Sequence, residues 1–140
     1  MKKLSYFHSL MSLLLPLLAT GFMASCETGK NTLVTADSLL INCWTHSYEE
    51  ESGGVEKIYR PCDYQEFPPS RYRNTYIFKE NNVCEYLTLA PNDAHTTSNG
   101  TWAYSKTDNK LIIKQENGVV LAELGVLELA ADKLVLKPLN

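Results

Sequence analysis

The side chains in this sequence that can do acid–base or metal chemistry are few and far apart. His46 stands by itself, whereas Asp93 and His95 lie together in a polar stretch. Brought together by a fold, the three would form a small metal-binding or proton-transfer site, since imidazole and carboxylate groups serve both purposes. The alternative is that each sits at the surface or makes an internal hydrogen bond. Because recognised catalytic motifs are absent, we expect no enzyme activity, cofactor or metal site.

Two arginines offer a second kind of chemistry. Arg71 and Arg73 alternate with Tyr72, so they share a face where the chain is extended. A pair of guanidinium groups can bind the carboxylate of a ligand. Alternatively, they bond loop carbonyls or pair with the many acidic residues of this chain.

The N-terminus predicts export. A basic start is followed by a largely apolar run over 10–24 and by small residues before Cys26. This order is typical of a secretory signal peptide, which we place at residues 1–25. The end of the run resembles a bacterial lipobox, which implies lipidation of Cys26; ordinary cleavage with a free Cys26 thiol is the alternative. Residues 26–37 are polar and are expected to form a flexible tether.

Removal of the signal peptide leaves a mildly acidic chain over residues 26–140, with the folded domain expected over 38–140. Lys2 and Lys3 are lost, so 11 basic and 16 acidic side chains remain, a formal charge of −5. Scattered acidic charge argues against nucleic acid binding. Apart from the signal, the sequence has no apolar run of membrane length, so lipid on Cys26 is the expected anchor. The residue after Cys26 is Glu27, whereas an aspartate at this position would resemble an inner-membrane retention signal. We therefore expect a periplasm-facing location at the outer membrane.

Export also permits disulfides. Three cysteines follow Cys26, namely Cys43, Cys62 and Cys84, and they allow one bridge and one free thiol in any of three pairings. A Cys62–Cys84 bridge would join an irregular loop to a hairpin, so these two are our candidates. Either can instead be a buried, small apolar residue.

Short alternating segments separated by turn residues predict strands. Strands are expected over 38–48, 55–59, 76–80, 83–89, 100–106, 111–113, 119–129 and 134–136. The segment 60–73 contains three prolines and is expected to be an irregular loop. A polar loop is expected over 90–99, and Gly125 marks a bend in a long strand.

Two turns bear on strand register. At Asn81-Asn82, a two-residue turn pairs Phe78 with Glu85, whereas a three-residue turn pairs Phe78 with Cys84. The three-residue turn is slightly favoured because it keeps Glu85 off the aromatic face. A two-residue turn at 117–118 would pair the core residues Leu111 with Leu124 and Ile113 with Ala122.

The expected fold is therefore all-β: an up-and-down antiparallel meander of about eight strands closed into a barrel. Its motifs, Cys43-Trp44, Tyr76-x-Phe78 and Gly100-Thr101-Trp102 ahead of Leu111-x-Ile113, resemble those of the lipocalin-like domains of small bacterial lipoproteins. The resemblance covers most of residues 38–137. It implies an antiparallel barrel and an apolar ligand, and it supplies no catalytic residues.

The aromatic residues expected inside the barrel are the candidate ligand-binding set: Trp44, Tyr76, Phe78, Trp102 and Tyr104, with Arg71 and Arg73 at the loop. They either line a cavity or fill the barrel completely, as in most small closed barrels. We therefore expect a lipid-anchored envelope protein that binds a small apolar or amphipathic molecule. The alternative is a solid module whose loops contact another envelope protein.

Overall fold

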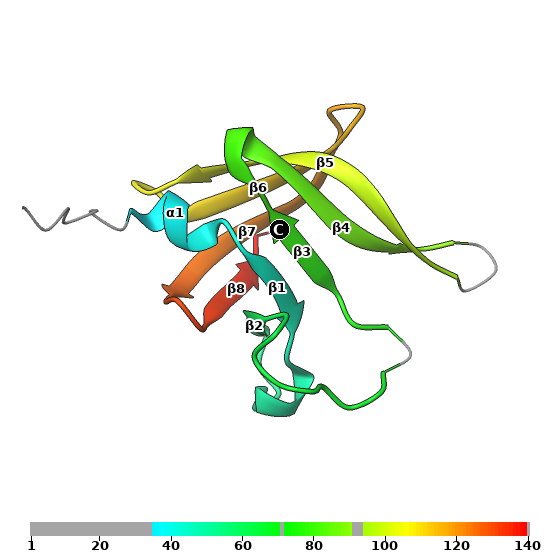
Figure 1. Ribbon diagram of the computed structural model, residues 1–140. Helices are drawn as coiled ribbons and strands as arrows, with labels where there is room; N and C mark the ends of the chain where they lie inside the picture. Colours follow the sequence, from blue (N-terminus) through cyan, green and yellow to red (C-terminus); the bar gives the residue numbers. More distant parts are fainter. Residues whose placement is uncertain (1–34, 71, 91–93, 140) are drawn as a thin grey trace, which may run out of the picture. The chain divides into compact units, whose positions relative to one another are not determined.

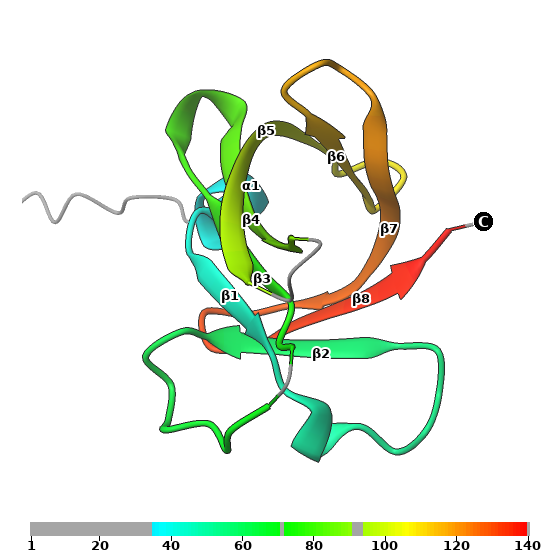
Figure 2. The same ribbon diagram turned by 90° about the vertical axis from the view of Figure 1, so that its right-hand side faces the viewer.

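The computed structural model of the chain describes residues 35–70, 72–90 and 94–139. Eight antiparallel strands close into a barrel in the order β1-β2-β8-β7-β6-β5-β4-β3 (Figures 1 and 2). The strands are β1 (Cys43–His46), β2 (Lys57–Pro61), β3 (Thr75–Phe78), β4 (Val83–Leu89), β5 (His95–Ser105), β6 (Lys110–Gln115), β7 (Val120–Leu129) and β8 (Leu134–Pro138). The expected all-β antiparallel barrel is confirmed. Among the described helices, none is long and apolar enough to cross a membrane.

Three short helices accompany the strands: α1 (Ala36–Leu40), η1 (Tyr48–Glu50) and η2 (Glu80–Asn82). Helix α1 corrects two expectations, because it occupies the end of the expected tether and the start of the expected first strand. Thr35 caps it by accepting a hydrogen bond from the Ser38 amide. Five residues are too few to show a helical period in the sequence. The expected signal peptide, Cys26 and the remainder of the expected tether lie outside the described residues.

The connection between β2 and β3 departs from a simple meander. Both strands pair antiparallel with β1, one on each side, so they run parallel to each other. Parallel strands cannot be joined by a tight turn; the chain must return along the length of the barrel. Residues 62–74 make this return, which explains why the proline-rich segment is long and irregular (Figure 1).

The β3–β4 hairpin has the favoured register. Tyr76 pairs with Tyr86 and Phe78 with Cys84. The turn needs left-handed backbone, and Asn81 and Asn82 supply it with φ angles of 58° and 62°.

The β6–β7 hairpin contains both expected core pairs, Leu111 with Leu124 and Ile113 with Ala122. Its turn is one residue longer than expected, since the Gln115 amide bonds the Val119 carbonyl and leaves 116–118 in the loop. A register shift beyond Ile113 absorbs the extra residue.

Two further boundaries differ from expectation. Strand β5 begins at His95 rather than at Gly100, so half of the expected polar loop is strand. The first part of this strand was not expected because its residues are mostly hydroxyl-bearing and show no apolar alternation. The inner wall of the barrel is polar there. The irregularity in β7 falls between Val126 and Glu128, just after Gly125, where a bend was expected.

Candidate ligand-binding site

A row of aromatic rings runs through the interior of the barrel. Consecutive ring centroids lie 5.2 Å apart from His46 to Tyr59, 5.6 Å from Tyr59 to Tyr76, 5.8 Å from Tyr76 to Phe78 and 5.5 Å from Phe78 to Trp102. These are normal spacings for attractive ring contacts. The row therefore links the end of β1, near the loops, to the end that carries the β3–β4 turn.

The end of the barrel beside α1 is filled. Trp44 is completely buried and its indole N–H donates to the Leu40 carbonyl at 2.9 Å. Trp102 is 5% exposed and its indole N–H donates to the Lys79 carbonyl at 3.0 Å. Phe78 is 1% exposed between the strands. These three candidate residues belong to a close-packed core, and we call this the closed end.

The opposite end holds a pocket of about 510 Å³ that is open to solvent; we call it the mouth pocket. Its lining comes from the segment before β3 and from the mouth ends of β3, β4 and β7. The polar and aromatic lining residues are Tyr72, Asn74, Tyr76, Tyr86 and Thr88, and the apolar ones are Leu87, Leu89, Leu121 and Ala122. The lining is therefore amphipathic. Of the candidate aromatics, Tyr76 borders this pocket.

A hydrogen-bonded group lies between the mouth pocket and the core. The Asn74 side-chain amide donates to the hydroxyls of Tyr59, at 3.2 Å, and Tyr76, at 3.0 Å. Burial raises the pKa of both phenols above the ordinary value, so both stay neutral. Asn74 thus holds two buried hydroxyl groups in fixed positions.

Hydroxyl groups continue along the inner wall. Thr88 of β4 faces Thr96 across the β4–β5 pair, with 2.9 Å between their oxygens, and lies 3.2 Å from the hydroxyl of Ser98. Sequence reasoning missed this wall. Thr88 and the Thr-Thr-Ser run 96–98 carried a signal, since hydroxyl residues are compatible with strands.

Tyr104 lies at the outside of the closed end. It lines a hollow of about 300 Å³ there, together with Trp102 from the edge of the core and residues of α1 and the β3–β4 turn. The Tyr104 hydroxyl donates to the Asn109 side chain at 3.2 Å. The structure therefore divides the candidate aromatics between the packed core, the mouth pocket and this outer hollow.

Arg73 connects the segments at the mouth end of β1 and before β3 through hydrogen bonds. Its guanidinium donates to both carboxylate oxygens of Glu49, at 2.7 and 3.1 Å, and to the carbonyls of His46 and Pro68. It also lies 4.9 Å from the centre of the Phe67 ring. The ion pair with Glu49 raises the pKa of Arg73, and its hydrogen bond lowers the pKa of Glu49. This is the alternative use of the arginine stated above. Arg71 lies outside the described residues.

A second arginine cluster was missed by sequence reasoning. Two nitrogens of Arg60 donate to the Glu50 carboxylate, Nε at 2.9 Å and Nη2. The third, Nη1, donates to the Asp132 carbonyl at 2.9 Å. These bonds hold η1 and the β7–β8 turn against β2. The hydrogen bond from Arg60 lowers the pKa of Glu50 to about 2. The sequence showed only a run of three glutamates, which predicts an exposed turn.

His46 is buried at 5% exposure, and its ring hydrogen-bonds the Glu51 carboxylate. Burial lowers its pKa below the ordinary value of 6.5, against the opposing effect of Glu51. His95 lies on β5, and β3 and β4 separate that strand from β1. Asp93 lies outside the described residues. Within the described ranges, no three His, Cys, Asp or Glu side chains gather as metal ligands.

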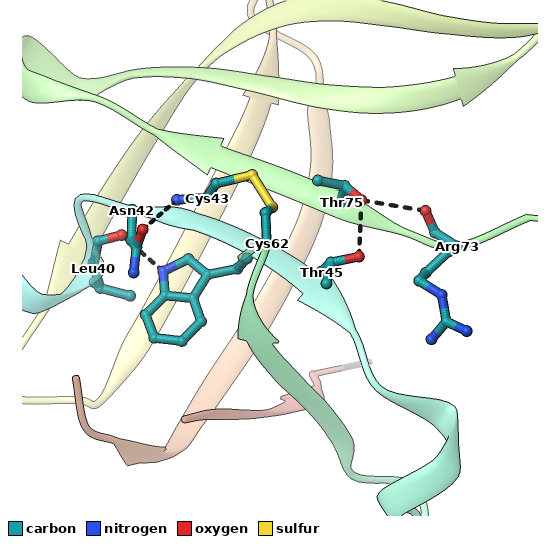
Figure 3. Close-up of a disulfide and its surroundings, with 8 residues drawn as sticks. Leu40, Asn42, Cys43, Thr45, Cys62, Arg73 and Thr75 are labelled. Carbon is teal, nitrogen blue, oxygen red and sulfur yellow. Dashed lines mark hydrogen bonds between the residues drawn. A yellow bond between two sulfur atoms is a disulfide. The ribbon is translucent and has the colours of Figure 1, made fainter. Parts of the chain in front are cut away.

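The disulfide joins Cys43 to Cys62, which corrects the candidate Cys62–Cys84 pairing (Figure 3). The reason is register: Trp44 pairs with Pro61 across β1 and β2, which brings the flanking cysteines together at a Cα separation of 5.4 Å. Cys84 points into the barrel, is fully buried and remains a thiol. Burial raises its pKa to about 11.

The chain forms a closed eight-stranded antiparallel barrel with one filled end and a pocket at the other, and barrels of this size are large enough to hold one small ligand. The lipocalin-like domain family model matches residues 40–136, which is most of the chain. The chain therefore belongs to the family of lipocalin-like domains. Neither the curated proteins nor the solved structures contain a match.

Proposed function

We propose that this protein is a lipid-anchored protein of the cell envelope that binds a small amphipathic molecule in the mouth pocket. One observation supports this above the others: the lining of the pocket combines the apolar residues Leu121 and Ala122 with the polar groups of Asn74 and Thr88. A ligand with one apolar and one polar side satisfies both halves of such a lining.

The packed closed end limits the ligand to the mouth. Leu111, Ile113 and Leu134 are completely buried there, alongside the two tryptophans. A close-packed interior leaves no room for a deeply inserted chain. The ligand is therefore compact rather than long.

The pocket is tested with the neutral dye N-phenyl-1-naphthylamine and the full chain in one fixed detergent. Ala122→Trp places a large ring in the pocket and is expected to weaken dye binding at least tenfold. Ala131→Trp, in the exposed β7–β8 turn, is the matched control and should bind like the wild type. Equal binding by the wild type and Ala122→Trp would contradict the proposal.

The anchor is a separate part of the proposal and rests on the sequence around Cys26. Mass spectrometry of protein isolated from its native membrane is the test. The expected mature chain begins at Cys26 and has acyl chains attached. A chain that begins elsewhere, or an unmodified Cys26, would refute the lipid anchor and leave the pocket untouched.

Contact with an envelope protein is the second candidate function. Exposed apolar side chains at the mouth favour it, among them Leu89 at 49% exposure and Val119 at 56%. Such side chains are more common at contact surfaces than elsewhere. Cross-linking in intact cells through a photoreactive residue at position 119 should then capture one defined partner, and no capture would count against this function.

A further inference from the structure

The mouth pocket has a polar neighbour. A second hollow of about 590 Å³, shallow and wide open to solvent, shares Tyr86 with it; we call it the side hollow. The pairing of β5 with β6 begins at Gly100 and Gln115. The side hollow lies beside the part of β5 that precedes Gly100 and has no partner on β6. Its other lining is hydroxyl and amide in character and includes Ser98, Asn99 and Asn117, with the exposed carboxylate of Glu116 at the turn.

Two amide groups near Tyr86 have unused hydrogen-bonding capacity. The side chain of Gln115 makes no hydrogen bond within the described part of the chain, and neither does the Oδ1 atom of Asn74. Asn99 also makes none, but it is exposed and pairs with Glu85 on the other face of the sheet. An amide offers both donors and acceptors, and so does a hydroxyl group. These amides therefore match a ligand that carries several hydroxyl groups.

The charges around the two hollows disfavour an anionic ligand. The described lining contains no lysine or arginine, and Arg73 and Arg60 are bound to Glu49 and Glu50. A carboxylate without a counter-charge loses its hydration without compensation. A fatty acid headgroup would therefore bind poorly here, whereas a neutral polar group would bind well.

Tyr86 supplies the apolar surface between the hollows. It is 6% exposed and its ring packs beside Gly100, where an added Cβ would lie 3.1 Å from Cε1. A tyrosine edge next to amides is suited to a ring compound with an apolar face and a hydroxylated rim.

We propose that the mouth binds a neutral glycoside. The sugar ring lies in the side hollow, where Gln115 binds its hydroxyl groups, and the apolar aglycone lies in the mouth pocket against Tyr86 and Leu121. This inference rests on the proposed function and names its ligand class.

Calorimetry with the full chain, in the same detergent, tests the proposal with four 4-nitrophenyl glycosides: the β-glucoside, β-galactoside, α-mannoside and N-acetyl-β-glucosaminide. 4-Nitroanisole keeps the aromatic ring and replaces the sugar with methyl, and 4-nitrobenzoate replaces it with a charge. At least one glycoside should bind tenfold more tightly than either control. A control ligand without the sugar leaves the polar groups of the site without hydrogen bonds, and this lowers its affinity. Gln115→Leu should remove at least fivefold of that affinity, whereas Gln65→Leu, in the exposed loop, should remove none.

The outcomes separate the two proposals. If 4-nitroanisole or 4-nitrobenzoate binds as tightly as every glycoside, the sugar inference is wrong and the amphipathic pocket stands. If no glycoside binds but N-phenyl-1-naphthylamine does, the sugar inference is likewise wrong and the amphipathic pocket stands. If neither the dye nor any of these compounds binds, both proposals are wrong. Unchanged glycoside affinity in Gln115→Leu would overturn the placement of the sugar.

Discussion

Cys43 and Cys62 lie side by side across the first two strands of the barrel, and their disulfide closes the β1–β2 segment at the closed end. Cys62 is also the first residue of the 62–74 return to β3. The bond therefore fixes the point from which the long connection leaves the barrel (Figure 3).

Reduction of this disulfide should destabilise the protein by about 3 kcal/mol, because it releases a closed loop of roughly 20 residues in the unfolded chain. Urea unfolding with and without a reductant measures the loss. Cys84→Ala should keep the full response to reductant, since Cys84 is a buried thiol. A Cys84→Ala variant that no longer responds would show that Cys84 takes part in the bond.

Acid should weaken the fold through Glu50. Arg60 lowers the pKa of Glu50 from 4.5 to about 2 in the folded protein. A carboxyl with a depressed folded pKa contributes stability above its unfolded pKa, and this is lost as the pH falls from about 5 towards 2. We expect a loss of about 1–2 kcal/mol, since solvent at the partly exposed pair screens much of the attraction.

Urea unfolding across this pH range tests the Glu50 prediction. Glu50→Gln should show a shallower fall in the free energy of unfolding than the wild type does. Glu66→Gln, in the exposed loop, is the matched control and should retain the wild-type slope. Identical slopes for the wild type and Glu50→Gln would contradict the role assigned to the Arg60 pair.

Gly100 is required by its neighbours on β4 and β6. A Cβ at this position would lie 2.2 Å from the Lys114 carbonyl oxygen, which is backbone and cannot move aside. Gly100→Ala should therefore cost about 3 kcal/mol or more of folding stability. In Gly54→Ala, the close atom is the end of the flexible Glu56 side chain, so this control should change stability by less than about 0.5 kcal/mol. Thermal unfolding of both variants gives the comparison.

Local sequence signals predicted the hairpins well. Asn81 and Asn82 tolerate left-handed backbone, and keeping Glu85 off the aromatic face favoured the register that the structure has. These features depend on a few neighbouring residues, whose conformational preferences are strong. The β6–β7 core pairs were also predicted correctly, although the two-residue turn from which they were derived is one residue too short.

Features that depend on distant pairing could not be predicted. The disulfide partner of Cys62 follows from the β1–β2 register, and the use of Arg73 follows from the loop that returns past Glu49. The division of the barrel into a packed end and a mouth pocket depends on which aromatic side chains border open space. Trp44 and Tyr76 are opposite each other across β1 and β3, yet only Tyr76 borders the mouth pocket.

The central claim is that ligand enters the mouth and never reaches the closed end. NMR of the full chain in detergent, titrated with N-phenyl-1-naphthylamine, tests it directly, because the indole N–H groups of Trp44 and Trp102 report from the packed core. We predict shifts in the amide signals of Tyr86, Leu121 and Ala122, with both indole signals unmoved. Shifts in the indole signals without changes at these three amides would contradict the account.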